Sequence, residues 1–185
     1  MNNFKTKLQP VEVEQATGNL LETYQSILKG LGFVPNLYKN LGNTPELLTA
    51  YLQLSDLLKQ TKNFTPAEND VIALSISKYN NCNYCISVHT MTSLKFSGVS
   101  ADVVSAIQNN QPIPDAKLNI LYITVQKIIA NKGVLEKADV DKFFEYGYND
   151  YHLFDIILEI SQKTISNYAN HLFQTTIDEQ FKLTN

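Results

Sequence analysis

The sequence has 185 residues, of which 44% are hydrophobic and 18% charged, and its net charge is −3. This composition is typical of a globular protein, because a disordered chain has fewer apolar residues and more net charge. It lacks the basic excess that nucleic-acid binding requires, so we expect no nucleic-acid partner. No apolar run is long enough to span a membrane, and residues 1–15 lack the apolar core of a signal peptide. These two features predict a cytoplasmic protein with no membrane partner.

Apolar residues recur at helical spacing along the chain, which predicts an all-α protein with a single domain over residues 1–185. Glycines follow the first periodic run, and Thr44-Pro45 supplies a cap and an N-terminal proline for a later one. The first helices are therefore expected at 17–29, in a short segment from Asn36, and from Thr44 through Leu58.

A capping box, Thr65-Pro66-Ala67-Glu68, predicts a helix that runs to Tyr79, and Asn80-Asn81 is expected to end it. The next helix is predicted to begin near Cys82 and to end at Gly98. The remaining helices are expected at 100–109, 115–131, 136–146 and 150–177, the last as one long helix or two joined ones.

The chain has only two cysteines, Cys82 and Cys85. A disulfide across so short a loop restrains the unfolded chain little, so the pair points to redox chemistry or metal binding. Together with His89 they stand at i, i+3 and i+7, which places the three side chains along one helical face. The positive end of the helix dipole favours a thiolate at this position.

These residue types make up a dithiol redox centre. One cysteine attacks as the thiolate and is oxidised, the other condenses with it to a disulfide, and an outside reductant restores the dithiol. Cys85 is the better candidate for the nucleophile because His89 lies one turn further on, which leaves Cys82 as the resolving thiol. Thioredoxin-like enzymes usually use the first cysteine, and the histidine is what reverses the choice here.

Two other interpretations of the motif remain open. Cys82, Cys85 and His89 could bind zinc with His171 or His152, although structural zinc usually takes four protein ligands. The cysteines could also be small buried residues beside a surface histidine. Haem attachment is excluded, because it needs a histidine directly after the second cysteine and Ile86 stands there.

The stretch 64–89, with an acidic residue, eleven residues, CxxC, three residues and histidine, resembles the core of the carboxymuconolactone decarboxylase superfamily. The similarity covers about 44–128 and is closest to the alkylhydroperoxidase D-like, peroxidase-related branch. Segments 32–36 and 165–171 also resemble that branch. The resemblance implies an all-α fold, a redox core at about 44–128 with helical extensions, and homo-oligomers that are trimers or hexamers, or are built from dimers.

The resemblance also implies an antioxidant peroxidase that reduces a hydroperoxide through Cys85, with Cys82 as the resolving thiol and His89 in a proton relay. The family's glutamate aligns with Asp70, which is one methylene shorter. No cofactor or metal is implied beyond the Cys82–Cys85 disulfide, and the electron donor is an external thiol or protein reductant. Further candidates for the pocket are Glu68, whose simpler role is the capping box, Ser77, Tyr84 and His171.

Three other functions follow from the same residues. One is a dithiol–disulfide oxidoreductase with little peroxidase activity, and another is a zinc-binding or structural oligomer. Lactone decarboxylation is a weaker alternative, because relatives with that chemistry generally lack the redox pair.

Overall fold

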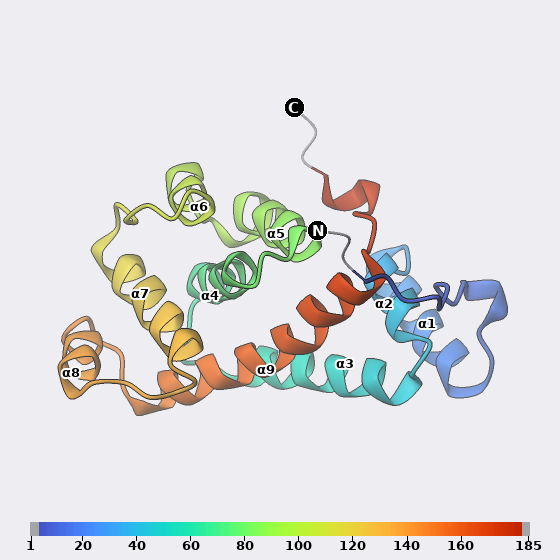
Figure 1. Ribbon diagram of the computed structural model, residues 1–185, viewed down its shortest axis with the longest axis horizontal. Coiled ribbons are helices and arrows are strands. Elements are labelled where there is room, and N and C mark those ends of the chain that lie inside the picture. Colours follow the sequence, from blue (N-terminus) through green and yellow to red (C-terminus); the bar gives the residue numbers. More distant parts are fainter. Residues whose placement is uncertain (1–3, 183–185) are drawn as a thin grey trace.

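The computed structural model describes residues 4–182, and this part of the chain contains α-helices and short helical turns but no strand. The prediction of an all-α fold is confirmed (Figure 1). None of the described helices is both long and apolar enough to cross a membrane. The helices are α1 Gly18–Leu31, α2 Asn36–Leu41, α3 Pro45–Gln60, α4 Pro66–Tyr79, α5 Asn83–Thr92, α6 Ala101–Gln108, α7 Ala116–Ala130, α8 Lys137–Glu145 and α9 Asp150–Phe173. The turns are η1 Val13–Gln15, η2 Ser93–Ser97 and η3 Glu179–Phe181.

The start of α4 and the turn after it follow the predicted local rules. The Thr65 hydroxyl accepts the Glu68 N–H at 3.2 Å, and the Glu68 carboxylate accepts the Thr65 N–H at 2.9 Å, so the capping box is formed. Asn81 has a φ of 55°, the left-handed conformation that asparagine tolerates better than most residues. This residue reverses the chain and directs α5 back along α4.

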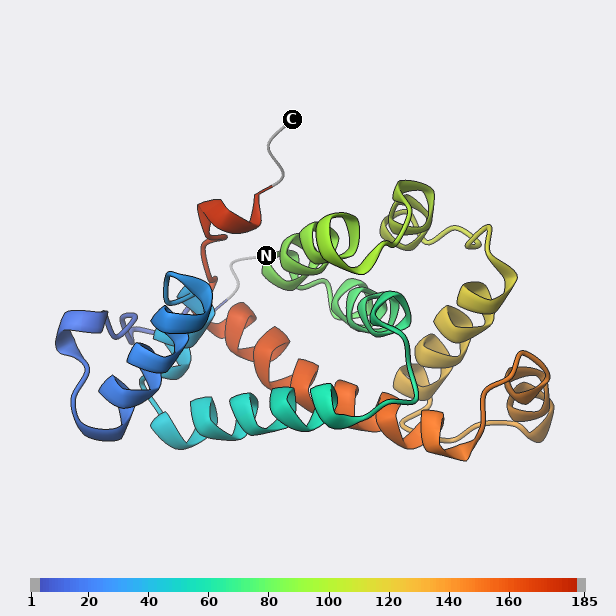
Figure 2. The same ribbon diagram turned by 180° about the vertical axis from the view of Figure 1, so that it is seen from behind.

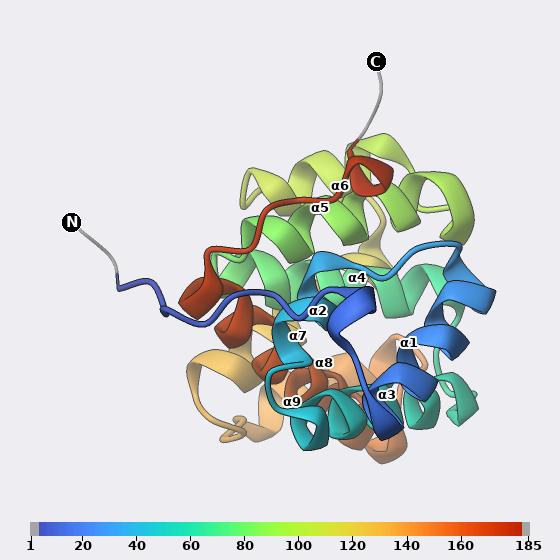
Figure 3. The same cartoon turned by 90° about the vertical axis from the view of Figure 1, so that its right-hand side faces the viewer.

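One predicted boundary is confirmed and another is wrong. The helix expected from Cys82 to Gly98 is α-helical to Thr92, continues as the wider π-helical turn η2, and ends as predicted at the left-handed Gly98. The helix expected over 150–177 is one helix that stops at Phe173, because Gln174 turns left-handed. The segment after it runs beside α5, where the Ser87 hydroxyl donates to the Phe181 carbonyl at 2.8 Å (Figure 3).

Two apolar cores meet at α4, α5 and α9. One lies among α4, α6, α7, α8 and the first half of α9. The other lies among α1, α2, α3, the beginning of α5 and the second half of α9, and it includes both cysteines. Helix α9 passes beneath both cores and packs against α3, α4 and α5 (Figures 1 and 2). The cysteine motif is thereby pressed against the middle and C-terminal turns of α9.

Candidate active site

The two thiols lie at the N-terminus of α5. Cys82 is the N-cap residue and Cys85 is in the first turn, and their exposed fractions are 0% and 3%. Both are free thiols in the structure. The Cys82 N–H donates to the Ser77 carbonyl at 2.9 Å, which ties the motif to the end of α4. The amide nitrogen of Asn170 on α9 lies 3.3 Å from the Cys85 sulfur and 3.6 Å from the Cys82 sulfur.

Asp70 reaches His89 despite its shorter side chain. The His89 Nδ1 lies 3.2 Å from Asp70 Oδ1, and the Thr92 hydroxyl donates to the same oxygen at 2.9 Å. The π-helical turn brings Ser97 onto the other carboxylate oxygen, where its hydroxyl donates as well. Burial opposes ionisation of Asp70, but the hydrogen bonds from His89, Ser97 and Thr92 prevail and lower its pKa. The carboxylate is therefore held as an anion with both oxygens occupied.

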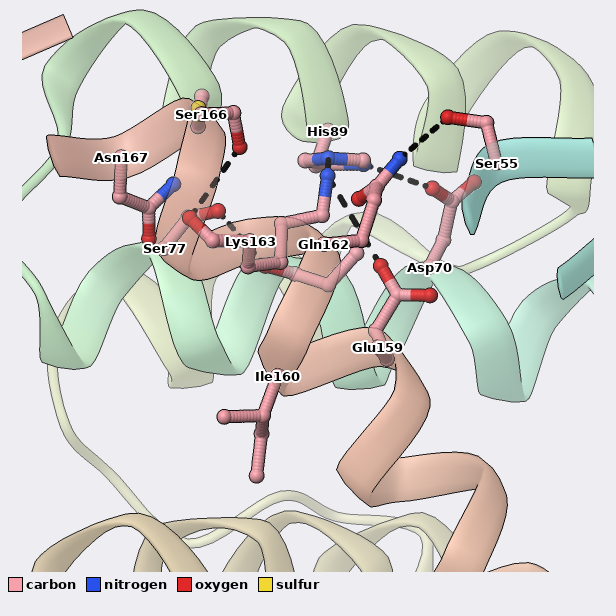
Figure 4. Close-up of polar contacts among 12 residues, drawn as sticks. Ser55, Asp70, Ser77, His89, Glu159, Ile160, Gln162, Lys163, Ser166 and Asn167 are labelled. Atoms are coloured by element: carbon pink, nitrogen blue, oxygen red, sulfur yellow. Dashed lines mark hydrogen bonds and ion pairs between the residues drawn. The ribbon is translucent and has the colours of Figure 1, made fainter. Parts of the chain in front are cut away.

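A buried lysine completes this chain of groups. Lys163 on α9 is 3% exposed, and its ammonium nitrogen lies 2.6 Å from His89 Nε2 (Figure 4). Glu159, one turn earlier, lies 3.8 Å from the same nitrogen. Burial and the neighbouring Lys163 lower the pKa of His89 to about 4, with Asp70 opposing them. The imidazole is thus neutral at pH 7, and it donates from Nδ1 to Asp70 and accepts at Nε2 from Lys163.

The surroundings of the two thiols shift their pKa values in opposite directions. A hydrogen bond from Cys82 lowers the pKa of Cys85; burial opposes this shift, whereas the positive charge of Lys163 and hydrogen bonds from Ser166 and Asn167 add to it. The pKa of Cys82 is raised, because it shares that hydrogen bond and is buried. Cys85 is therefore the thiol that carries the negative charge, and a thiolate is the reactive form.

A cleft of about 830 Å³ is lined in part by Asp70, His89 and Lys163, the three residues of this hydrogen-bonded series. Residues of α1, α2 and α3 line part of it, among them Ile27, Tyr38 and Tyr51, and residues of α4, α5 and α9 line the rest. Gln162 donates from Nε2 to the Ser55 hydroxyl at 2.7 Å, while its buried Oε1 accepts no hydrogen bond from the described residues. The polar lining residues from α4, α5 and α9 are Asn69, Asp70, His89, Thr92, Glu159, Gln162 and Lys163. The volume of the cleft is sufficient for a small organic molecule.

The other predicted pocket residues lie outside this cleft. Glu68, predicted as a possible pocket residue, does not line the cleft. Its carboxylate is bound by Thr65, by Lys117 at 2.9 Å and by the Tyr148 hydroxyl at 2.9 Å. Ser77 is buried and donates to the Ala73 carbonyl at 2.7 Å.

Tyr84 and His171 line a second cavity, on the Cys82 side of the motif. The Tyr84 hydroxyl donates to the Asp178 carboxylate at 2.6 Å, and the His171 Nε2 lies 3.4 Å from the Asn81 carbonyl. The other histidine proposed as a zinc ligand besides His171 is His152, and its ring nitrogens lie within hydrogen-bonding distance of Asn149 and of the Asn63 carbonyl. Within residues 4–182, no three His, Cys, Asp or Glu side chains are grouped to hold a metal ion.

From α9 the sequence predicted only a polar face with Asn167 and His171, and most of the buried polar face was missed. Polar side chains at helical spacing form its buried face, and these are Glu159, Gln162, Lys163, Ser166, Asn167 and Asn170. A polar stripe opposite an exposed apolar one is the reverse of the usual pattern for a surface helix. That inverted periodicity was the signal available in the sequence.

Comparison with known proteins supports the assignment that the motif suggested. Residues 45–114 match the model of the carboxymuconolactone decarboxylase family. The family match over this part of the chain and the shared fold support the carboxymuconolactone decarboxylase superfamily, and the fold is that of the alkylhydroperoxidase core. No curated protein matches the sequence.

Several solved structures share the fold over nearly the whole chain. A peroxidase-related protein from Ralstonia eutropha JMP134 with an alkylhydroperoxidase core is 21% identical, with a TM-score of 0.82 over 94% of this chain and 93% of that one. A peroxidase-related protein from Silicibacter sp. TM1040 is 20% identical, with a TM-score of 0.76 over 98% and 95%. A cysteine-to-alanine variant of the debrominase Bmp8 in complex with 2,3,4-tribromopyrrole is 20% identical, with a TM-score of 0.74 over 97% and 96%.

Proposed function

We propose that this chain is a thiol-dependent peroxidase that reduces organic hydroperoxides with the Cys82–Cys85 dithiol. The observation that carries the proposal is the buried Lys163–His89–Asp70 series of contacts; the hydrogen bond from Cys82 and, after it, the positive charge of Lys163 lower the pKa of Cys85. The family match over residues 45–114 and the fold shared with peroxidase-related proteins support the same function. The cleft beside these contacts is the expected site for the hydroperoxide.

In the first step, the Cys85 thiolate attacks the terminal oxygen of the hydroperoxide. A sulfur–oxygen bond forms, the oxygen–oxygen bond breaks, and the alkoxide takes a proton from the Lys163 ammonium to leave as the alcohol. Cys85 becomes a sulfenic acid. His89 holds the ammonium in place by accepting its hydrogen bond at Nε2, and Asp70 orients the imidazole through Nδ1, which completes the proton relay.

In the second step, Cys82 gives its proton to the neutral Lys163 amine and attacks the Cys85 sulfur. The sulfur–sulfur bond forms, the sulfur–oxygen bond breaks, and the hydroxide takes the proton to leave as water. An external reductant with two thiols, or two molecules of a monothiol, then supplies two electrons and two protons. One proton returns to Cys82 and the other to Lys163, so the starting state is restored.

Stopped-flow oxidation by cumene hydroperoxide tests the proposal. Wild-type protein should lose both thiols, Cys82→Ser should stop at a sulfenic acid that dimedone traps on Cys85, and Cys85→Ser should not react. An unchanged rate in Cys85→Ser would contradict the assignment. Protein that is inert to the peroxide but exchanges rapidly with disulfide substrates would instead be a dithiol–disulfide oxidoreductase.

Reductive dehalogenation is a second candidate, favoured by the fold shared with debrominase Bmp8 and by the unused Gln162 Oε1 in the cleft. That oxygen could accept a heteroaromatic ring N–H. The dithiol would be oxidised to the disulfide while a carbon–bromine bond became carbon–hydrogen and HBr was released. Bromide release from brominated pyrroles by the reduced protein, measured beside the peroxide reaction, distinguishes the two activities.

A further inference from the structure

A second cavity lies on the other side of the cysteine motif from the cleft described above. It has a volume of about 590 Å³ and is formed by the turn before α5, the first residues of α5 and the last turn of α9. Its walls include Asn81, Cys82, Asn83, Tyr84, Asn170 and His171. It shares no lining residue with the cleft that contains His89 and Lys163. We call it the Cys82 cavity.

Asn170 marks the Cys82 cavity as a place for a ligand. Its side chain is 4% exposed and its Nδ2 contacts both sulfurs, at 3.3 and 3.6 Å. Its Oδ1 is buried and accepts no hydrogen bond from the described residues. An unpaired buried acceptor costs free energy, so a ligand with an N–H group at this position would gain by binding. Such a ligand would lie directly beside the dithiol.

The chemistry of disulfide reduction also distinguishes the two sulfurs. A thiolate attacks one sulfur in line and expels the other, and the reaction is faster when the expelled thiol is the more acidic. Cys85 is the better leaving group, because Lys163, Ser166 and Asn167 stabilise its thiolate. The attack is therefore favoured at Cys82, which is the cysteine that lines the second cavity.

We infer that the reductant does not use the peroxide cleft but enters the Cys82 cavity, attacks Cys82 there, and is a thiol with an adjacent amide N–H, as in a cysteine-containing peptide. This inference rests on the disulfide cycle of the proposed function. The thiolate of the peptide forms a mixed disulfide with Cys82 and releases Cys85 as the thiolate. A second peptide thiolate attacks the peptide sulfur, yields the oxidised peptide and releases Cys82, which takes up a proton. The proton that the first peptide thiol loses on ionising returns to Lys163 through solvent before the attack, so Lys163 is again an ammonium when the Cys85 thiolate leaves.

The two half-reactions can be measured separately. The disulfide form is prepared with diamide, so its reduction is measured whether or not the protein reacts with peroxides. Glutathione serves as the peptide thiol, 2-mercaptoethanol as a thiol without an amide, and cumene hydroperoxide as the oxidant. His171→Trp should fill the Cys82 cavity, His171→Ala is its matched control, and Ser26→Trp obstructs the cleft on the opposite side.

We expect His171→Trp to slow reduction by glutathione by about tenfold or more and to change peroxide oxidation by no more than about twofold, with His171→Ala near wild type in both. Ser26→Trp should show the opposite pattern. Asn170→Ala should lower the rate ratio of glutathione to 2-mercaptoethanol, and peptide mapping should find the glutathione adduct on Cys82. An adduct on Cys85, or equal slowing of both half-reactions by His171→Trp, would overturn the inference. Absence of peroxide oxidation beside normal reduction kinetics would instead contradict the proposed function alone.

Discussion

At the scale of single residues, Lys163 links the two halves of the site. Its ammonium is buried, donates to His89 at 2.6 Å and lies 3.8 Å from Glu159. Burial raises the pKa of Glu159, with Lys163 opposing that rise. A buried charge is expensive unless it is paired, and under the proposed function this cation stabilises the thiolate of Cys85.

Replacing Lys163 with methionine should raise the pKa of Cys85, because the positive charge that stabilises its thiolate is removed. Ultraviolet absorbance of the thiolate, followed against pH, should move to higher pH, and the rate of peroxide oxidation at pH 7 should fall by about tenfold or more, since one pKa unit is a factor of ten in thiolate. Lys163→Arg, which keeps the charge, should retain the low thiol pKa. An unmoved titration in Lys163→Met would show that the lysine has only a structural role.

Part of the site could be predicted from the sequence because it is local. The spacing of Cys82, Cys85 and His89 fixes their order along one helix, and a single helix start sets their environment. Whether Asp70 reaches His89 depends on how α4 packs against α5. The sequence therefore could not show whether aspartate, one methylene shorter than glutamate, is long enough for this contact. The place of Lys163 in the site was harder still to predict. In the sequence, Glu159 and Lys163 at i, i+4 resemble an ordinary solvent-exposed ion pair, and only the packing of α9 against the cysteine motif shows that they are buried.

At the scale of helices, the boundaries set by local hydrogen bonds were the predictable ones. The capping box of α4 is an example, since it needs only residues three apart in sequence. The π-helical turn after α5 and the end of α9 were not predictable in this way. Ser97 in the turn is held by Asp70, 27 positions earlier, and the chain after α9 is held by Asp178, which accepts the backbone N–H of Asn36. Such distant contacts carry no local sequence pattern.

The α4 cap gives a test of stability that is independent of activity. Thr65→Ala removes the acceptor for the Glu68 N–H, and it should lower the free energy of unfolding by about 1 kcal/mol. Urea denaturation measures the change. Ser100→Ala is the matched control, because Ser100 is the N-cap of α6 but makes no side-chain cap hydrogen bond. Equal losses in the two variants would show that the α4 capping box does not contribute as the structure indicates.

At the scale of the whole molecule, α9 presents opposite faces to two environments. Its polar face supplies the site, while its outer face carries large exposed apolar side chains, which are Tyr151, Phe154, Ile157, Tyr168 and Leu172. Tyr168 lies between two grooves, of about 350 and 290 Å³, and lines both of them. Large exposed apolar side chains gathered on one helix are typical of an association site. We propose that a second copy of the chain covers it, as the homo-oligomers of the superfamily suggest.

Tyr168→Lys should therefore disrupt self-association, because it places a charge on the apolar face of α9 that a second copy of the chain would cover. Sedimentation velocity should show wild-type protein as an oligomer and the variant shifted toward the 20.9 kDa monomer. Phe96→Lys is the matched control, since Phe96 is 76% exposed but lies in the π-helical turn, outside α9. A wild-type monomer, or an oligomer that only Phe96→Lys disrupts, would contradict this use of α9. Because the same helix carries Lys163, the oxidation rate of the monomeric variant also reports whether association supports the site.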